Sequence, residues 1–320
     1  MTIQIGIEIE MKTISGNEVM EVMEAAGANC YGSICGYHGG PDANSGQWKM
    51  ERDGSLHGPD ATMTHKGAME VISPILYGPQ GVATINRILT GLVAKGATVD
   101  RECGTHISVG LNNKARWVAM SPSKKQEVAN RIIAAYNHFQ PVFDAISANC
   151  RSAGGNGYIG HARRLDDYST EHQAAGGRGS RGGAVNLAYY IQFGRIEFRQ
   201  PGYTLNKKNI ARWLKIINSM VSMALNENHC SRTMNLATVP VTVDGFSDYL
   251  GLRLNVRESV RARVLQLYND YRRGRVERLA VLAEVEDAGN FAFTLDGRCI
   301  SCGEVIVNCY EGQNLCEGCE

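Results

Sequence analysis

The first ten residues constrain the fold most, because isoleucine and acidic side chains alternate there. Isoleucine occupies every second position from Ile3 to Ile9, and Glu8 and Glu10 fall on the other side of the same segment. This period of two predicts a β-strand over residues 2–10, with one apolar face and one acidic face. A strand so rich in isoleucine is expected at the centre of a sheet, where both of its faces are covered.

Glu8 and Glu10 place two carboxylates on one face of this strand. Neighbouring carboxylates repel each other, which raises the free-energy cost of ionising both. If the face is covered, the two charges need a counter-ion, and oxygen ligands suit Mg²⁺ or Mn²⁺. Taken alone, the segment is equally compatible with an acidic strand that faces solvent.

Two later strands repeat this mixture of charge and apolar residues. His106 follows Gly-Thr on a strand predicted over residues 105–111, and Glu197 stands between Arg195 and Arg199 on another. An Arg-x-Glu-x-Arg strand is costly to cover unless something is bound to it, so we expect Glu197 to hold a metal and the arginines to hold phosphate oxygens. A ladder of salt bridges would explain any one of these strands, but three in one chain favour a site.

Five of the ten cysteines lie close to the C-terminus. Two C-x-x-C pairs, Cys299 with Cys302 and Cys316 with Cys319, can each place two thiolates on one ion, and together they complete a tetrahedral zinc site. The spacing predicts a zinc ribbon whose metal supplies its folding energy, with Cys309 as a spare ligand. A redox pair or coincidental spacing is the alternative.

The remaining pattern predicts an α+β fold with an antiparallel sheet. Helices are expected over residues 17–26, 81–94, 206–225 and 256–271 and from Pro122 onward, and further strands over 47–51, 68–73 and a hairpin of 184–190 with 195–199. The glycine-rich stretches 29–46 and 151–184 are expected to be irregular. The second is rich in arginine, and a loop of this length is usually functional or disordered.

The charge of the chain is nearly balanced, with 33 Lys and Arg against 32 Asp and Glu, a net charge of +1. This balance argues against a protein that wraps nucleic acid over its whole surface. No run approaches the roughly 18 apolar residues that a membrane span needs. The N-terminus lacks the basic and apolar regions of a signal peptide, so we expect a cytoplasmic protein without membrane contact.

Six short motifs occur in a fixed order, and the last is followed by Gly202, Thr204 and Trp213. They are Gly6–Glu10, Trp48 with Asp53–Leu56, Met69–Pro74, Cys103–Val109, Arg181–Leu187 and Ile196–Arg199. Over residues 3–225 this order resembles the amidoligase family, a branch of the glutamine synthetase and glutamate–cysteine ligase superfamily. The resemblance implies an antiparallel sheet curved into a half-barrel and flanked by helices, with ATP and divalent metals in its mouth. It also implies ATP-dependent joining of a carboxylate to an amine through an acyl phosphate.

The resemblance assigns roles to individual residues. The metal ligands it implies, for Mg²⁺ or Mn²⁺, are Glu8, Glu10, Glu70, His106 and Glu197. The catalytic and nucleotide-binding residues it implies are Asp53, which faces substrate, Arg195 and Arg199, which face phosphate, and Arg181 and Asn186, which lie near the nucleotide or acyl phosphate. Gln200 departs from the family, which usually has histidine after this strand, so substrate contacts there are expected to differ.

The predicted organisation is an amidoligase-like catalytic domain over residues 1–228, a helical extension over 229–290 and a zinc ribbon over 291–320. The implied cofactors are ATP, Mg²⁺ or Mn²⁺, and a structural Zn²⁺. The implied partners are a carboxylate donor and an amine acceptor, which is a small molecule, a peptide or a protein. The ribbon is a candidate for docking another protein or a nucleic acid.

Three alternatives compete with the ligase. The run Arg178–Gly183 resembles RNA-binding Arg-Gly segments, so the chain is alternatively a nucleic-acid-binding module that uses this loop and the ribbon without catalysis. The balanced charge and the shortness of the run argue against it. A metal-dependent transferase or hydrolase, and a ligase relative that has lost activity, are the others. The sequence leaves the acid, the amine and the oligomeric state open.

Overall fold

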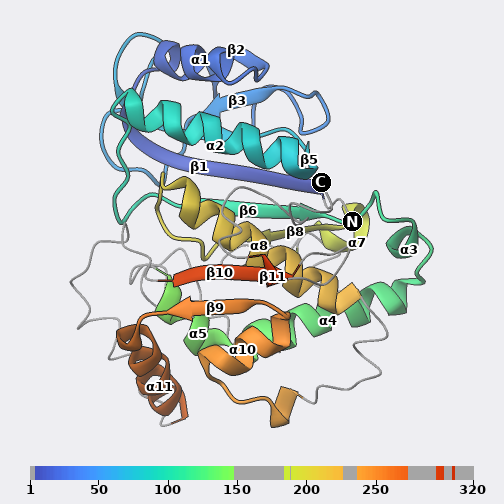
Figure 1. Cartoon of the computed structure of the whole chain (residues 1–320). Coiled ribbons are helices and arrows are strands. Elements are labelled where there is room, and N and C mark those ends of the chain that lie inside the picture. Colours follow the sequence, from blue (N-terminus) through green and yellow to red (C-terminus); the bar gives the residue numbers. More distant parts are fainter. Residues whose placement is uncertain are drawn as a thin grey trace.

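The computed structural model describes residues 4–147, 184–187, 189–225, 236–272, 293–298 and 305–306. Its larger sheet has eight strands in the order β2-β3-β4-β1-β6-β8-β7, with β5 paired to β1 beside that path (Figure 1). These strands are β1 Gln4–Ile14, β2 Cys30–Cys35, β3 Trp48–Glu51, β4 Gly67–Ile72, β5 Leu76–Tyr77, β6 Thr105–Gly110, β7 Val185–Asn186 and β8 Arg195–Phe198. The sheet is open among the described strands, with β2 and β7 at its edges.

Strand β1 is central, as its isoleucines predicted, and it extends four residues beyond the expected end. It pairs antiparallel with β4 on one side and with β6 on the other. On the first side Glu10 is opposite Glu70, and on the second side Glu8 is opposite His106. The position of β1 therefore brings side chains from distant parts of the chain onto one face of the sheet.

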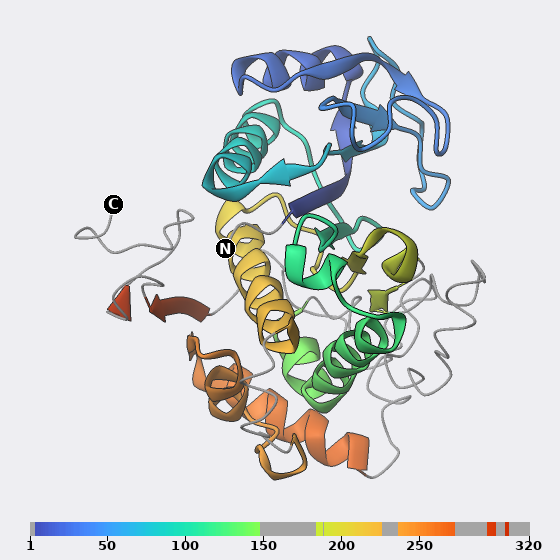
Figure 2. The same cartoon turned by 90° about the vertical axis from the view of Figure 1, so that its right-hand side faces the viewer.

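The helices that accompany this sheet are α1 Gly16–Ala25, α2 Gly78–Ala94, α3 Ala115–Val118, α4 Pro122–His138, α5 Gln140–Ile146, α7 Tyr190–Phe193 and α8 Lys207–Leu225. The fully buried Ile7 and Ile9 belong to one hydrophobic core with side chains of α1, α2, α4 and α8. Figures 1 and 2 show α2 and α8 on the same side of the sheet. Because side chains alternate along a strand, the charged residues of β1 lie on the other side.

The remaining described elements are the 3₁₀ turn Leu236–Thr238, α10 Val243–Leu250, β9 Arg253–Val256, α11 Glu258–Arg272, β10 Phe293–Arg298 and β11 Val305–Ile306. Side chains of α10, β9 and α11 belong to the same hydrophobic core. Phe246 of α10 contacts Phe139 and Phe143 at ring-centroid distances of 4.8 and 5.0 Å. A second sheet has the order β11-β10-β9. No helix within the described ranges is long and apolar enough to span a membrane.

The prediction of a purely antiparallel sheet is wrong at one edge. Strand β2 lies in the stretch 29–46, which was expected to be irregular, and it pairs parallel to β3. Three of its six residues are exposed and only the last is buried, so this edge strand has no apolar alternation that would have predicted it. The hairpin near residue 190 forms through β7 and β8, but the predicted first strand is two residues long and a helical turn follows it.

Candidate metal and phosphate site

Charged side chains from five strands cluster on the face of the sheet opposite the isoleucines. Strand register places Glu51 of β3 beside Glu70 of β4, and Glu70 beside Glu10 of β1. On the other side of β1, register places Ser108 of β6 beside Glu197 of β8. The side chains of this cluster are buried, between 1% and 8% exposed for Glu10, Glu51, Glu70, His106 and Glu197. Buried charges at this density need compensation by opposite charge.

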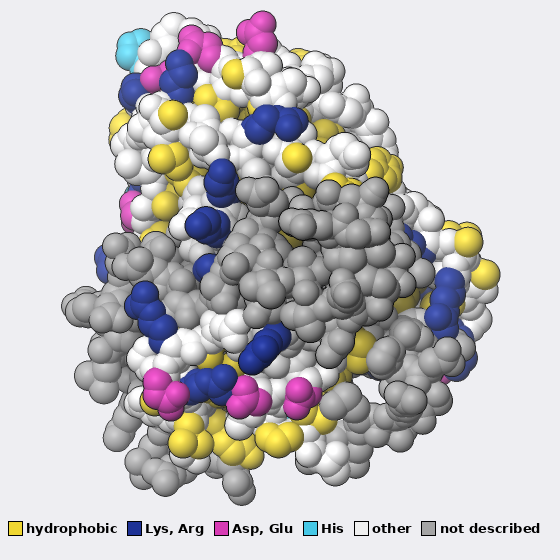
Figure 3. Space-filling view, in the orientation of Figure 1, with side chains coloured by type: hydrophobic (Ala, Val, Ile, Leu, Met, Phe, Trp, Pro, Cys, Tyr) yellow, Lys and Arg dark blue, Asp and Glu magenta, His cyan; other side chains and the backbone are white. Residues whose placement is uncertain are grey.

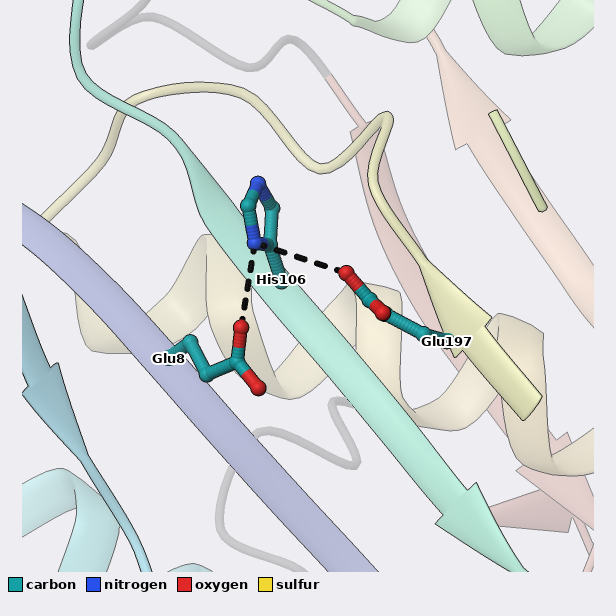
Figure 4. A group of neighbouring side chains, drawn as sticks. All are labelled: Glu8, His106 and Glu197. Carbon is teal, nitrogen blue, oxygen red and sulfur yellow. Dashed lines mark hydrogen bonds and ion pairs between the residues drawn. The ribbon is translucent and has the colours of Figure 1, made fainter. Parts of the chain in front are cut away.

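The imidazole of His106 stands at the centre of the cluster. Its Nδ1 lies 3.2 Å from Glu8 Oε2 and 3.6 Å from Glu197 Oε1, and Figure 4 shows both carboxylates turned toward this nitrogen. Its Nε2 lies 3.7 Å from Glu10 Oε1, is buried, and makes no hydrogen bond within the described part of the chain. Each ring nitrogen therefore faces carboxylate oxygens.

Two sets of side chains in this cluster have the geometry of cation sites. Glu8, His106 and Glu197 form one set, and Glu10, Glu70 and His106 form the other, with the ligand atoms of each set within 4.8 Å of one another. Several carboxylate oxygens with one imidazole nitrogen suit Mg²⁺ or Mn²⁺. The unbonded Nε2 and the crowded carboxylates fit bound cations, because cations would satisfy both.

The crowding of carboxylates changes the pKa of Glu70. Burial raises its pKa well above 4.5, and the charges of Glu8, Glu10, Asp53 and Glu51 raise that pKa further. Without a cation, this group therefore holds its proton at pH values where an ordinary glutamate is ionised. A divalent cation would displace the proton when it binds.

The pKa of Glu8 is shifted in the opposite direction, below its usual value. Burial raises its pKa, but the hydrogen bond with His106 and the electrostatic effect of His106, Arg195 and Arg199 outweigh burial and lower the pKa to about 2. Glu8 is therefore ionised at neutral pH and is ready to bind a cation. The two ends of the cluster differ in charge, since the β8 side carries arginines and the β3 side carries carboxylates.

The arginines of β8 border the cluster. Arg195 Nη2 lies 2.9 Å from Glu8 Oε1, and its Nε donates to Ser108 Oγ at 3.1 Å. Arg199 Nε lies 3.5 Å from Glu197 Oε1. The side chains of Arg195 and Arg199 are 38% and 23% exposed, so each contacts the carboxylates and also reaches solvent. Such guanidinium groups are suited to bind phosphate oxygens that approach from outside.

The other predicted site residues have different positions. Asn186 donates from Nδ2 to Glu197 Oε2 at 2.8 Å, so it orients a candidate metal ligand. Asp53 lies in the loop after β3, where its Oδ1 accepts a hydrogen bond from the backbone of Ser55 at 2.8 Å. Its charge is close enough to Glu70 to raise that residue's pKa.

Some of the predicted site falls outside the described residues. Arg181 and most of the arginine- and glycine-rich loop 151–184 are among the residues that the structure does not describe. The four cysteines of the predicted zinc ribbon lie there too, namely Cys299, Cys302, Cys316 and Cys319. Their zinc site stays a prediction.

Sequence reasoning missed Glu51, which is 1% exposed and lies beside Glu70. Its Oε2 lies 2.7 Å from Lys49 Nζ, and its Oε1 accepts a hydrogen bond from the backbone of His38. The signal was present in the alternation Trp48-Lys-Met-Glu51, which places the two charged residues on the face that carries the cluster.

Gln200 follows β8, where substrate contacts were expected, but its side chain belongs to the core. It is fully buried, its Oε1 accepts a hydrogen bond from the hydroxyl of Tyr136 at 2.5 Å, and its Nε2 donates to Asp144 Oδ1 at 2.5 Å. This position is therefore used here to anchor the end of β8 against α4 and α5.

Comparison with known proteins supports the family resemblance over the N-terminal part of the chain. A family model described as "Putative amidoligase enzyme" matches residues 1–120. That stretch carries four of the candidate metal ligands, Glu8, Glu10, Glu70 and His106. No curated protein matches the chain. A solved structure described as a novel glutamine synthase homolog aligns with 90% of this chain and 69% of its own length, at 13% identity and a TM-score of 0.35.

Proposed function

We propose that this protein is an ATP-dependent ligase that joins a carboxylate to an amine through an acyl phosphate. The observation that carries the proposal is the arrangement of His106 between two sets of carboxylates, with Arg195 and Arg199 bordering them. Two cation sites next to two arginines suit a triphosphate, which needs positive charge on several oxygens at once. The family match over residues 1–120 supports a ligase.

The proposed chemistry overcomes the poor reactivity of a carboxylate. Transfer of the terminal phosphoryl group of ATP to the acid forms an acyl phosphate and ADP, and the amine then displaces phosphate to form the amide. Cations held by the two carboxylate sets would neutralise charge on the phosphates. Arg195 and Arg199 would stabilise the same charge from the other side. Asp53, in the loop after β3, would accept the proton that the amine loses.

Turnover with mixtures of candidate substrates tests this proposal. Wild-type protein with ATP and Mg²⁺ should release ADP and phosphate when a pool of acids and a pool of amines are both present. Glu10→Gln keeps the shape of a candidate metal ligand but removes its charge, and it should lower the rate by more than about 100-fold, since even outer-shell changes at metal sites cost 10- to 100-fold. Glu21→Gln, which alters an exposed ion pair with Lys95, is the matched control.

The nucleic-acid-binding alternative predicts no release of ADP with any substrate pool and tight binding of RNA. On the face seen in Figure 3, the described Lys and Arg side chains are scattered among acidic and apolar ones and do not form one basic patch. This distribution favours the ligase. Absence of nucleotide turnover with every pool, together with tight RNA binding in a gel-shift assay, would refute the ligase proposal.

A further inference from the structure

The short helix α7 lies at one end of the sheet, between β7 and β8 in the chain (Figure 1). Tyr190 is fully buried there, its hydroxyl donates to the Lys125 carbonyl at 2.8 Å, and it accepts a hydrogen bond from the Trp117 indole at 3.2 Å. Gly194 ends the helix with a φ of +66°, and a Cβ there would lie 3.1 Å from the Trp117 ring. The backbone of α7 is therefore fixed by packing.

The outer side of α7 exposes two aromatic rings. Tyr189 and Phe193 are 39% and 50% exposed, and their ring centroids are 6.1 Å apart with the planes inclined by 47°. They are four residues apart, and the Phe193 amide donates to the Tyr189 carbonyl at 2.9 Å. Adjacent exposed aromatic side chains on a fixed backbone are typical of a binding surface.

This aromatic pair adjoins the candidate phosphate site through one residue. The guanidinium carbon of Arg195 lies 5.9 Å from the centroid of the Tyr189 ring, and the Arg195 amide donates to the Tyr189 carbonyl at 3.4 Å. The same guanidinium lies 2.9 Å from Glu8. Arg195 therefore lies between the aromatic pair on one side and the candidate cation ligands on the other.

We propose that Tyr189, with Phe193 beside it, is the stacking surface for the base of the ATP, an inference that rests on the proposed function. A nucleoside triphosphate has a flat, weakly polar base at one end and a highly charged chain at the other. The cation ligands and Arg195 suit the charged end, and the exposed rings suit the base. Stacking on an aromatic ring accepts any base, so ATP and GTP should bind with similar affinity.

Comparison of ATP with inorganic triphosphate isolates the contribution of the base. With Mg²⁺ and the full chain, calorimetry should show that ATP binds the wild type more tightly than triphosphate does. Tyr189→Ala should weaken ATP by about 5- to 150-fold, the range for loss of one stacked base, and leave triphosphate unchanged. Tyr189→Phe keeps the ring and should keep the affinity. Tyr31→Ala removes a tyrosine of equal exposure, 39%, on the edge strand β2 and should change neither ligand.

Other outcomes separate this inference from the proposed function. If Tyr189→Ala and Phe193→Ala bind ATP like the wild type, or weaken ATP and triphosphate equally, the stacking surface is refuted while the ligase proposal stands. If the wild type binds neither ATP nor triphosphate, the proposed function fails and this inference fails with it. Thermal melting of each variant shows whether a loss of binding is a loss of folding.

Discussion

Replacement of Glu70 by glutamine should stabilise the metal-free protein, although it removes a candidate metal ligand. In the folded chain the pKa of Glu70 is raised well above 4.5 by burial and by neighbouring carboxylates. A group with a raised folded pKa adds stability below its unfolded pKa, and that stability is lost as the pH rises toward the folded pKa. Metal-free wild type should therefore weaken with pH from about 4.5 upward, because its unfolded state loses this proton first.

The size of this pH effect on the free energy of unfolding follows from one proton, which the folded state keeps and the unfolded state loses. Between 4.5 and the raised pKa, this single group lowers the free energy of unfolding by about 1.4 kcal/mol for each pH unit. Glu70→Gln has no titrating carboxyl at this position, so its free energy of unfolding should not show this decrease with pH. The variant should gain about 1.4 kcal/mol on the wild type with each unit of pH in that window.

Urea unfolding in the presence of EDTA at pH 5, 6 and 7 measures the difference. Glu21→Gln, which removes an exposed carboxylate, should keep the wild-type slope. At pH 5 and 6, Mn²⁺ at 100 times its Kd should reverse the order, because it adds about 2.7 kcal/mol to the wild type, more than the roughly 2.1 kcal/mol that Glu70 costs at pH 6, and the variant binds Mn²⁺ weakly. Equal slopes for wild type and Glu70→Gln in EDTA would refute the crowding argument.

Three further predictions concern single features of the chain. Asn186→Ala should lower Mn²⁺ affinity by about 10- to 100-fold, because Glu197 loses the hydrogen bond that orients it, and a Mn²⁺ titration measures this. Ser15→Ala should lower the free energy of unfolding by about 1 kcal/mol in urea, because it removes the N-cap of α1. Metal analysis should find about one zinc per chain, and a protein with Cys299→Ser and Cys302→Ser that keeps its zinc would contradict the predicted ribbon.

Alternation along single strands was enough to predict the carboxylates of β1, and with them a central strand. It predicted which side chains share a face, because that depends only on the period of two. Which strands lie beside one another depends on pairings between residues far apart in the chain. Arg195 contacts Glu8 across 187 positions, and no local pattern specifies such a contact.

Other features required the tertiary structure. The sequence places Gln200 directly after the charged strand and so suggests a position in the site. In the structure its side chain belongs to a buried hydrogen-bond network with Tyr136 and Asp144. The importance of Glu51 depends on the pairing of β3 with β4, which sets it beside Glu70. Strand β2 was missed because an exposed edge strand needs no apolar period.

The central imidazole also sets a limit on how the two cation sites fill. A neutral histidine ring has one lone pair for a metal, since its other nitrogen carries the proton. A cation bound through Nδ1 beside Glu8 therefore leaves an N–H directed at Glu10, and a cation bound through Nε2 reverses this. The choice of tautomer at His106 decides which site has a nitrogen ligand. Loading of one site should therefore weaken the histidine contact of the other.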